Sequence, residues 1–146
     1  MNSEQYFLDA SFLIALIDST DVHHARANLL KQMLINSDKE IFLSDVLVNE
    51  VMTGLKSRCR KGNRAGQFPL MAKKVADFMV DQPILCLYEL INQNYGRLIS
   101  MMVQSDGKMS FHDCLIAFFL KQIPEVTLVT FDKDFNEVKG LKILSD

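Results

Sequence analysis

The feature that most constrains the fold is an alternation of short apolar runs with longer helical segments along the whole chain. The runs have the length of buried strands, and the apolar residues of the segments between them recur at helical spacing. We expect strands at residues 6–8, 39–43, 84–87, 127–129 and, at an edge, 141–144. Strands that alternate with helices predict an α/β domain with a central, mostly parallel sheet.

Polar residues before the helical segments predict where several helices begin. Side-chain oxygens at such positions accept hydrogen bonds from the first free backbone N–H groups of a helix. The expected caps are Thr20 or Asp21, then Ser44, and Ser110 in a capping box with Asp113. The helix after Ser110 is apolar nearly all round, so it is predicted to be buried.

Composition indicates one globular domain, residues 1–146. About half of the 146 residues are hydrophobic, which is enough for one sizeable core. The three cysteines show no C-x-x-C spacing, so a reducing compartment is expected rather than a disulfide framework or a zinc site. The N-terminus lacks the pattern of a secretory signal, and every apolar run is too short to span a membrane. We therefore expect a cytoplasmic protein without membrane contact.

Four acidic residues occupy the ends of buried segments. Asp9 follows the first predicted strand, and Asp132 follows the apolar run 126–131. Asp113 lies at the start of the apolar helix, and Glu50 lies at helical spacing among apolar neighbours. Because parallel strands end at one edge of a sheet, where ligands bind, some of these acids are expected to converge. Converging carboxylates need a cation, so the pattern predicts a divalent-metal site and phosphate chemistry.

Each acid also has a purely structural interpretation. Asp113 fits a capping box, Glu50 could be a surface acid on an amphipathic helix, and Asp132 could be a turn residue with Asp134 competing for the same role. Asp9 is the hardest to explain structurally, because its surroundings in the sequence are almost wholly apolar.

Other catalytic chemistries lack their sequence signals. There is no G-x-S-x-G elbow, no P-loop and no G-x-G-x-x-G fingerprint. Three histidines, two of them adjacent, give little support to a zinc site. His112 is expected to point into solvent or to pack on its own helix.

The net charge of −2 conceals one basic stretch, residues 51–76, which contains seven Lys and Arg residues and no acid. A concentrated basic segment in an acidic protein suggests contact with a polyanion, although a solvated helix end and loop would look the same. The candidate RNA-binding residues are Lys56, Arg58, Arg60, Lys61 and Arg64.

Four segments resemble, in order, the acidic motifs of the PIN-domain nucleases, in particular the small VapC-like toxin ribonucleases of toxin–antitoxin modules. These segments are residues 6–16, 49–51, 110–117 and 128–135. The resemblance implies a PIN-like three-layer α/β/α domain with a central sheet of about five strands. It also implies metal-dependent cleavage of RNA, a small antitoxin partner and a possible homodimer.

By this resemblance, four acids are both the catalytic and the metal-binding residues, and the cofactor is Mg²⁺ or Mn²⁺. These acids are Asp9, Glu50, Asp113 and Asp132. Three further residues would support them: Ser11, Thr130 and Asp134.

The leading hypothesis is therefore an endoribonuclease toxin that cleaves phosphodiester bonds with metal-activated water. The alternative is a PIN-like module that binds RNA or protein without cutting it. A phosphatase of another α/β class is disfavoured, because Asp9-Ala10-Ser11 stands where an Asp-x-Asp nucleophile motif would be needed.

Overall fold

The structure is a computed structural model and describes residues 4–145. Its centre is a five-stranded sheet in the order β3-β2-β1-β4-β5, in which every neighbouring pair is parallel. The strands are β1 (Gln5–Leu8), β2 (Glu40–Ser44), β3 (Ile84–Leu85), β4 (Thr127–Val129) and β5 (Lys142–Leu144). The predicted parallel sheet is confirmed, and the edge strand expected at 141–144 is present as β5, which begins one residue later.

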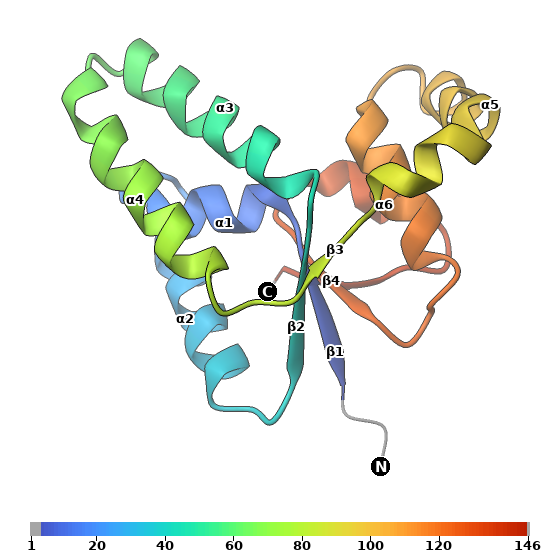
Figure 1. Ribbon diagram of the computed structural model, residues 1–146, viewed down its shortest axis with the longest axis horizontal. Coiled ribbons are helices and arrows are strands. Elements are labelled where there is room, and N and C mark those ends of the chain that lie inside the picture. The colour runs from blue at the N-terminus through green and yellow to red at the C-terminus, as the bar shows by residue number, and fades with distance from the viewer. Residues whose placement is uncertain (1–3, 146) are drawn as a thin grey trace.

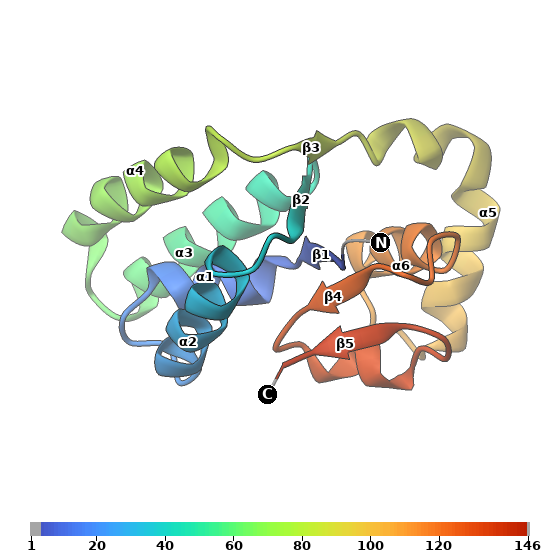
Figure 2. The ribbon, with the colours of Figure 1, turned by 90° about the horizontal axis from the view of Figure 1, so that it is seen from below.

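Helices cover both faces of this sheet. Four helices form one layer: α1 (Ala10–Ile17), α2 (His24–Ile35), α3 (Leu47–Lys61) and α4 (Phe68–Met79). The opposite layer contains α5 (Tyr88–Gln104) and α6 (Phe111–Leu120), as Figures 1 and 2 show. The predicted three-layer α/β/α arrangement is therefore confirmed. Two short 3₁₀ helices, η1 (Ala65–Gln67) and η2 (Lys133–Glu137), complete the described elements.

The two layers enclose two separate hydrophobic cores, because successive strand side chains point to opposite faces. In β1, Tyr6 and Leu8 belong to the core beneath α1–α4, whereas Phe7 belongs to the core beneath α5 and α6. In β4, Val129 likewise belongs to the core beneath α1–α4, and Leu128 belongs to the core beneath α5 and α6. Strands buried on both faces have apolar side chains at successive positions, which explains why these runs are apolar throughout.

Chain order places a switch point between β1 and β4. From β1 the chain moves outward through β2 to β3, and it then returns to the other side of β1 to form β4 and β5. The loops after β1 and β4 therefore leave the sheet side by side, in opposite directions. Asp9 and Asp132 lie on these two loops.

Two of the predicted helix caps are wrong. The helix expected to begin at Thr20 or Asp21 begins at His24, and Asp21 instead accepts a hydrogen bond from the backbone N–H of His23 at 2.8 Å. Ser44 ends β2 rather than capping α3, and its buried hydroxyl has no hydrogen-bond partner within residues 4–145. A two-residue connection, Asp45 and Val46, separates strand from helix, which a cap rule applied to sequence alone does not foresee.

Asp45 stabilises a helix that is distant in the sequence. Its carboxylate accepts hydrogen bonds from the N–H groups of Leu87, at 2.9 Å, and Tyr88, at 3.3 Å, where α5 begins. We expect Asp45→Ala to destabilise the fold by about 1 kcal/mol, because these helix-terminal donors lose their acceptor. Urea denaturation checks this value, and Asp45→Asn, which keeps an acceptor oxygen, should recover most of the loss. An unchanged unfolding midpoint for Asp45→Ala would contradict this role.

None of the helices within residues 4–145 has the length and apolar character that crossing a membrane requires.

Candidate functional site

Asp9 is the most tightly held acid of the molecule's candidate site. It is the N-cap of α1 and is 3% exposed. Its Oδ2 atom accepts hydrogen bonds from the Ser11 hydroxyl at 2.6 Å, the Thr130 hydroxyl at 2.8 Å and the Ser11 N–H at 3.3 Å. Burial raises the pKa of Asp9, the two hydroxyls oppose this shift, and the charge of Asp113 adds to it.

The supporting hydroxyls join the end of β1 to the end of β4. Ser11 accepts a hydrogen bond from the N–H of Phe131, and Thr130 accepts one from the N–H of Asp132, both at 3.0 Å. Each hydroxyl therefore donates to Asp9 and accepts from the loop that follows β4. This geometry fixes the Asp9 carboxylate relative to the segment that contains Asp132.

Glu50 approaches from α3, whose first turns lie over the same edge of the sheet. Close contact of α1 and α3 at Gly54, where a Cβ atom would lie 2.6 Å from Ile14 Cδ1, brings the two helices together. Burial raises the pKa of Glu50 to about 7, with further contributions from the charges of Asp9, Asp113 and Asp132. Its Oε2 atom is buried and has no hydrogen-bond partner among the described residues.

The other two acids are engaged by local backbone groups. Asp113 and Ser110 form the predicted capping box, in which Asp113 accepts from the Ser110 N–H at 2.7 Å. Asp132 is the N-cap of η2 and accepts from the N–H of Asp134 at 2.9 Å. Asp134 thus supports Asp132 through its backbone. Within residues 4–145, no three His, Cys, Asp or Glu side chains are grouped closely enough to hold a metal ion.

The charges of Asp9, Asp113 and Asp132 are nevertheless near enough to raise the pKa of Glu50, and the charge of Asp113 raises the pKa of Asp9. We call these four acids the acidic edge: Asp9, Glu50, Asp113 and Asp132. An unpartnered buried carboxylate oxygen is costly, and so is an anion beside three other anions. A divalent cation with oxygen ligands would relieve both costs, and it needs only one or two carboxylates in addition to water. The donor set of the acidic edge therefore fits such a cation, although these side chains do not form a closed ligand shell.

The raised pKa of Glu50 has a consequence for stability in the absence of metal. Because the folded state holds this proton more tightly than the unfolded chain does, stability falls as pH rises from about 4.5 towards 7. We expect Glu50→Gln to remove about 2–3 kcal/mol of this loss between pH 5 and pH 8 in EDTA, measured by urea denaturation. The exposed acid Glu125 provides a matched control, since Glu125→Gln should leave the pH dependence unchanged. If the free energy of unfolding depends on pH equally in wild type and Glu50→Gln, the pKa of Glu50 is not raised in the folded protein.

The basic stretch divides into two groups with different surroundings. Lys56, Arg60 and Lys61 line an open groove of about 560 Å³ on the exposed face of α3. These three residues remain the predicted RNA-binding residues of this segment. They lie in the second half of α3, which extends away from the sheet (Figure 1) and thus away from Glu50.

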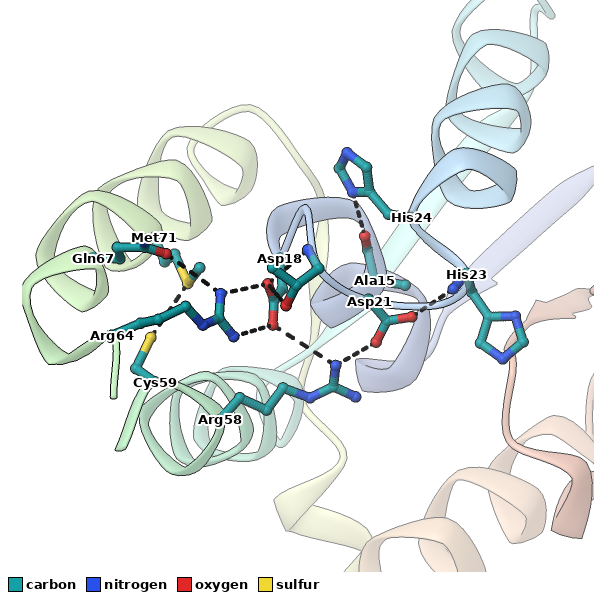
Figure 3. A network of polar contacts seen from close by, with 11 residues as sticks. Ala15, Asp18, Asp21, His23, His24, Arg58, Cys59, Arg64, Gln67 and Met71 are labelled. Atoms are coloured by element: carbon teal, nitrogen blue, oxygen red, sulfur yellow. Dashed lines mark hydrogen bonds and ion pairs between the residues drawn. The ribbon is translucent and has the colours of Figure 1, made fainter. Parts of the chain in front are cut away.

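Arg58 and Arg64 instead hold two acids within the protein. Asp18, the fully buried C-cap of α1, accepts from Arg64 through both oxygens, at 3.0 and 3.2 Å, as Figure 3 shows. Arg58 pairs with Asp21 and lies 3.8 Å from Asp18. A negative charge is unfavourable at a helix C-terminus, so the arginines compensate for it. Both arginines thus have ion-pair partners within the protein, and the phosphate contacts predicted for Arg58 and Arg64 stay a prediction.

Two residues near these sites were not expected from the sequence. The Nδ1 atom of His112 lies 3.6 Å from Glu50 Oε1, so His112 faces the acidic edge rather than solvent. The sequence signal that could have identified His112 is its position next to Asp113 in the first turn of α6. The signal for Asp18 is weaker, because a single acid directly after an apolar helix resembles an ordinary helix end.

No curated protein matches this chain. Among solved structures, VapC20 from Mycobacterium tuberculosis, described as a sarcin–ricin loop cleaving toxin, superposes with a TM-score of 0.67 at 19% identity, covering 92% of this chain and 95% of that chain. VapBC2 from Rickettsia felis, bound to a promoter DNA fragment, gives 0.62 at 20% identity, covering 96% and 97%. DNA-bound VapBC from Salmonella typhimurium gives 0.63 at 16% identity, covering 96% of each chain.

At these identities the solved structures establish a shared fold. The family itself follows from a separate comparison, in which the model of the PIN domain matches residues 6–141. That range contains all four residues of the acidic edge and both hydroxyls that support Asp9. With its parallel sheet and its acids at the switch point, this chain belongs to the PIN domain family.

Proposed function

We propose that this protein is a divalent-metal-dependent endoribonuclease and the toxin of a toxin–antitoxin pair. The observation that carries the proposal is the acidic edge, where a buried Asp9 and a Glu50 with an unpartnered oxygen meet at the sheet's switch point. A protein that only binds RNA has no reason to bear this repulsion. Asp9, Glu50, Asp113 and Asp132 are the proposed metal-binding and catalytic residues, with Mg²⁺ or Mn²⁺ as the cofactor.

The chain's own residues have distinct proposed roles. Ser11 and Thr130 hold Asp9 in one orientation, so its second oxygen can face the cation and the substrate phosphate. Glu50, whose pKa lies near 7, would lose its proton near neutral pH and could then hold the cation through its carboxylate. When bound, a divalent cation activates water and neutralises charge on the phosphodiester. No protein nucleophile is required.

An antitoxin partner is proposed from the VapBC complexes and from one surface of this chain. An apolar pocket of about 220 Å³ lies between α2 and α4, lined in part by Phe12, Ile35 and Phe78. Such a groove suits the apolar face of a partner helix. Co-expression with the product of an adjacent small open reading frame, followed by co-purification, tests this part of the proposal. A second copy of this chain is the other proposed partner, and sedimentation of the purified protein tests it.

RNA cleavage is tested with purified, partner-free protein and a pool of single-stranded and structured RNAs, incubated with Mg²⁺, Mn²⁺ or EDTA. Cleavage with either metal and intact RNA in EDTA is the expected result. Intact RNA in every lane, from protein shown to be folded, would favour the non-catalytic binding module. Cleavage that persists in EDTA would contradict the role of the metal.

A further inference from the structure

A pocket of about 200 Å³ lies directly beside the acidic edge, on the side of β4 and β5. Thr130 and Asp132 belong both to this pocket and to the acidic edge or its support. The lining also brings together the N-terminal end of α2, with His23 as its N-cap, and η2, which are more than a hundred positions apart in the sequence. The lining residues that matter here are His23, Arg26, Lys133 and Asn136.

The pocket has two positive charges that no ion pair in the described part of the chain neutralises. Within residues 4–145, neither Arg26 nor Lys133 forms an ion pair, and the buried Nε atom of Arg26 has no hydrogen-bond partner. Among the described lining residues, Asp132 has the one carboxylate, and it accepts from the N–H of Asp134. Arg58 and Arg64, by contrast, are paired with Asp18 and Asp21. A buried donor without an acceptor is costly, so Arg26 favours an anionic ligand in this pocket.

An aromatic platform stands at the same place. The His23 ring stacks on Phe131, with centroids 4.5 Å apart and an angle of 7° between the planes. His23 is exposed, and in Figure 3 it points away from the Asp18 cluster. A flat ring held against a second ring in this way can stack on a nucleobase, provided that the base is unpaired.

We propose that this pocket is a nucleotide subsite for single-stranded RNA, adjacent to the position of the scissile phosphate. Arg26 and Lys133 bind one phosphate of the strand, and His23 stacks on the base of the same nucleotide. A strand bound in this way passes from a cationic pocket to the acidic edge, so the pocket sets which phosphodiester lies over the four acids. The proposal rests on the proposed function, because it assumes that RNA is the substrate.

Binding without cleavage tests the subsite independently of catalysis. A fluorescein-labelled 12-nucleotide RNA of randomised sequence is titrated with protein in EDTA, and anisotropy is recorded at several KCl concentrations. Arg26→Gln and Lys133→Gln should each reduce the slope of log K against log salt by about 0.7 and weaken binding about 5-fold at 0.1 M KCl. The controls Arg97→Gln and Lys121→Gln remove exposed cations that do not line the pocket and lie outside the basic stretch, and they should leave the slope unchanged.

Stacking has a different signature. His23→Ala should weaken binding at least about 5-fold without changing the salt slope, and His23→Phe should restore it. Unchanged binding in both Arg26→Gln and Lys133→Gln, equal losses in the control variants, or no RNA binding by the wild type would overturn the subsite. If the wild type binds RNA with the expected variant pattern but cleaves none in Mg²⁺ or Mn²⁺, the subsite stands and the proposed nuclease activity fails.

Discussion

Asp9→Asn is expected to reduce RNA cleavage by more than about 100-fold, because a residue that would bind the metal directly should matter more than the outer residues whose loss costs 10–100-fold. Asparagine keeps an oxygen that can accept from Ser11 and Thr130, so the local geometry survives. What is lost is the negative charge at the centre of the acidic edge. The measurement is the rate of RNA cleavage at saturating Mg²⁺ or Mn²⁺.

The same substitution should stabilise the metal-free protein. Two unit charges about 8 Å apart repel by about 2 kcal/mol at an effective dielectric near 20, and we expect relief of about this size when one of the four like charges is removed. For a chain of this size the melting temperature should rise by about 4–8 °C in EDTA at pH 8. Added Mg²⁺ or Mn²⁺ should raise the melting temperature of the wild type and have little effect on Asp9→Asn.

Asp38→Asn is the matched control for both measurements. Asp38 is exposed and precedes β2, at the opposite edge of the sheet from Asp9, so neither cleavage nor melting should change. If Asp9→Asn cleaves RNA as the wild type does, Asp9 is not a catalytic residue. If its melting temperature falls, the four acids do not destabilise the metal-free fold.

Arg64→Met is expected to destabilise the fold by about 3 kcal/mol, which lowers the melting temperature by about 6–12 °C. The substitution keeps most of the side-chain volume but leaves the carboxylate of Asp18 buried without its main partner. Arg58, 3.8 Å from Asp18, and the hydrogen bonds from Thr20 keep the loss near the lower end for a broken buried ion pair. Urea denaturation at pH 7 measures it.

Acid should reveal the origin of this loss. Arg64 is the main reason that the pKa of Asp18 lies well below its usual range. A lowered folded-state pKa stabilises the protein above the unfolded pKa of about 3.9, and this stabilisation disappears as pH falls below it. The difference between wild type and Arg64→Met should therefore narrow below pH 4.

A double-mutant cycle separates the ion pair from general packing. Adding Asp18→Asn to Arg64→Met removes the stranded charge and should recover at least about 1 kcal/mol. Arg60→Met removes an exposed cation from the last turn of α3 and should stay within about 0.5 kcal/mol of the wild type. If Arg60→Met and Arg64→Met are equally destabilising, the buried pair does not hold α1 in place.

The sequence by itself determined the fold class and the position of each strand. Runs such as Tyr6 to Leu8 are apolar on both faces because helices cover both faces of the sheet, and this pattern can be recognised in the sequence alone. The capping box of Ser110 and Asp113 was also predictable from the sequence, since it involves residues only three positions apart. The match to the PIN domain confirms the family that the four acidic motifs suggested.

Only the tertiary structure decided which charges are available. Arg58 and Arg64 look identical in sequence to Arg60, yet the end of α1 and the loop after it bring Asp18 and Asp21 to them, whereas Arg60 forms no ion pair within residues 4–145. The same holds for His23, whose stacking on Phe131 joins residues more than a hundred positions apart. Local patterns fix local structure because its hydrogen bonds are local. The partner of a long charged or aromatic side chain depends on how distant elements pack, and the spacing of residues along the chain does not predict this packing.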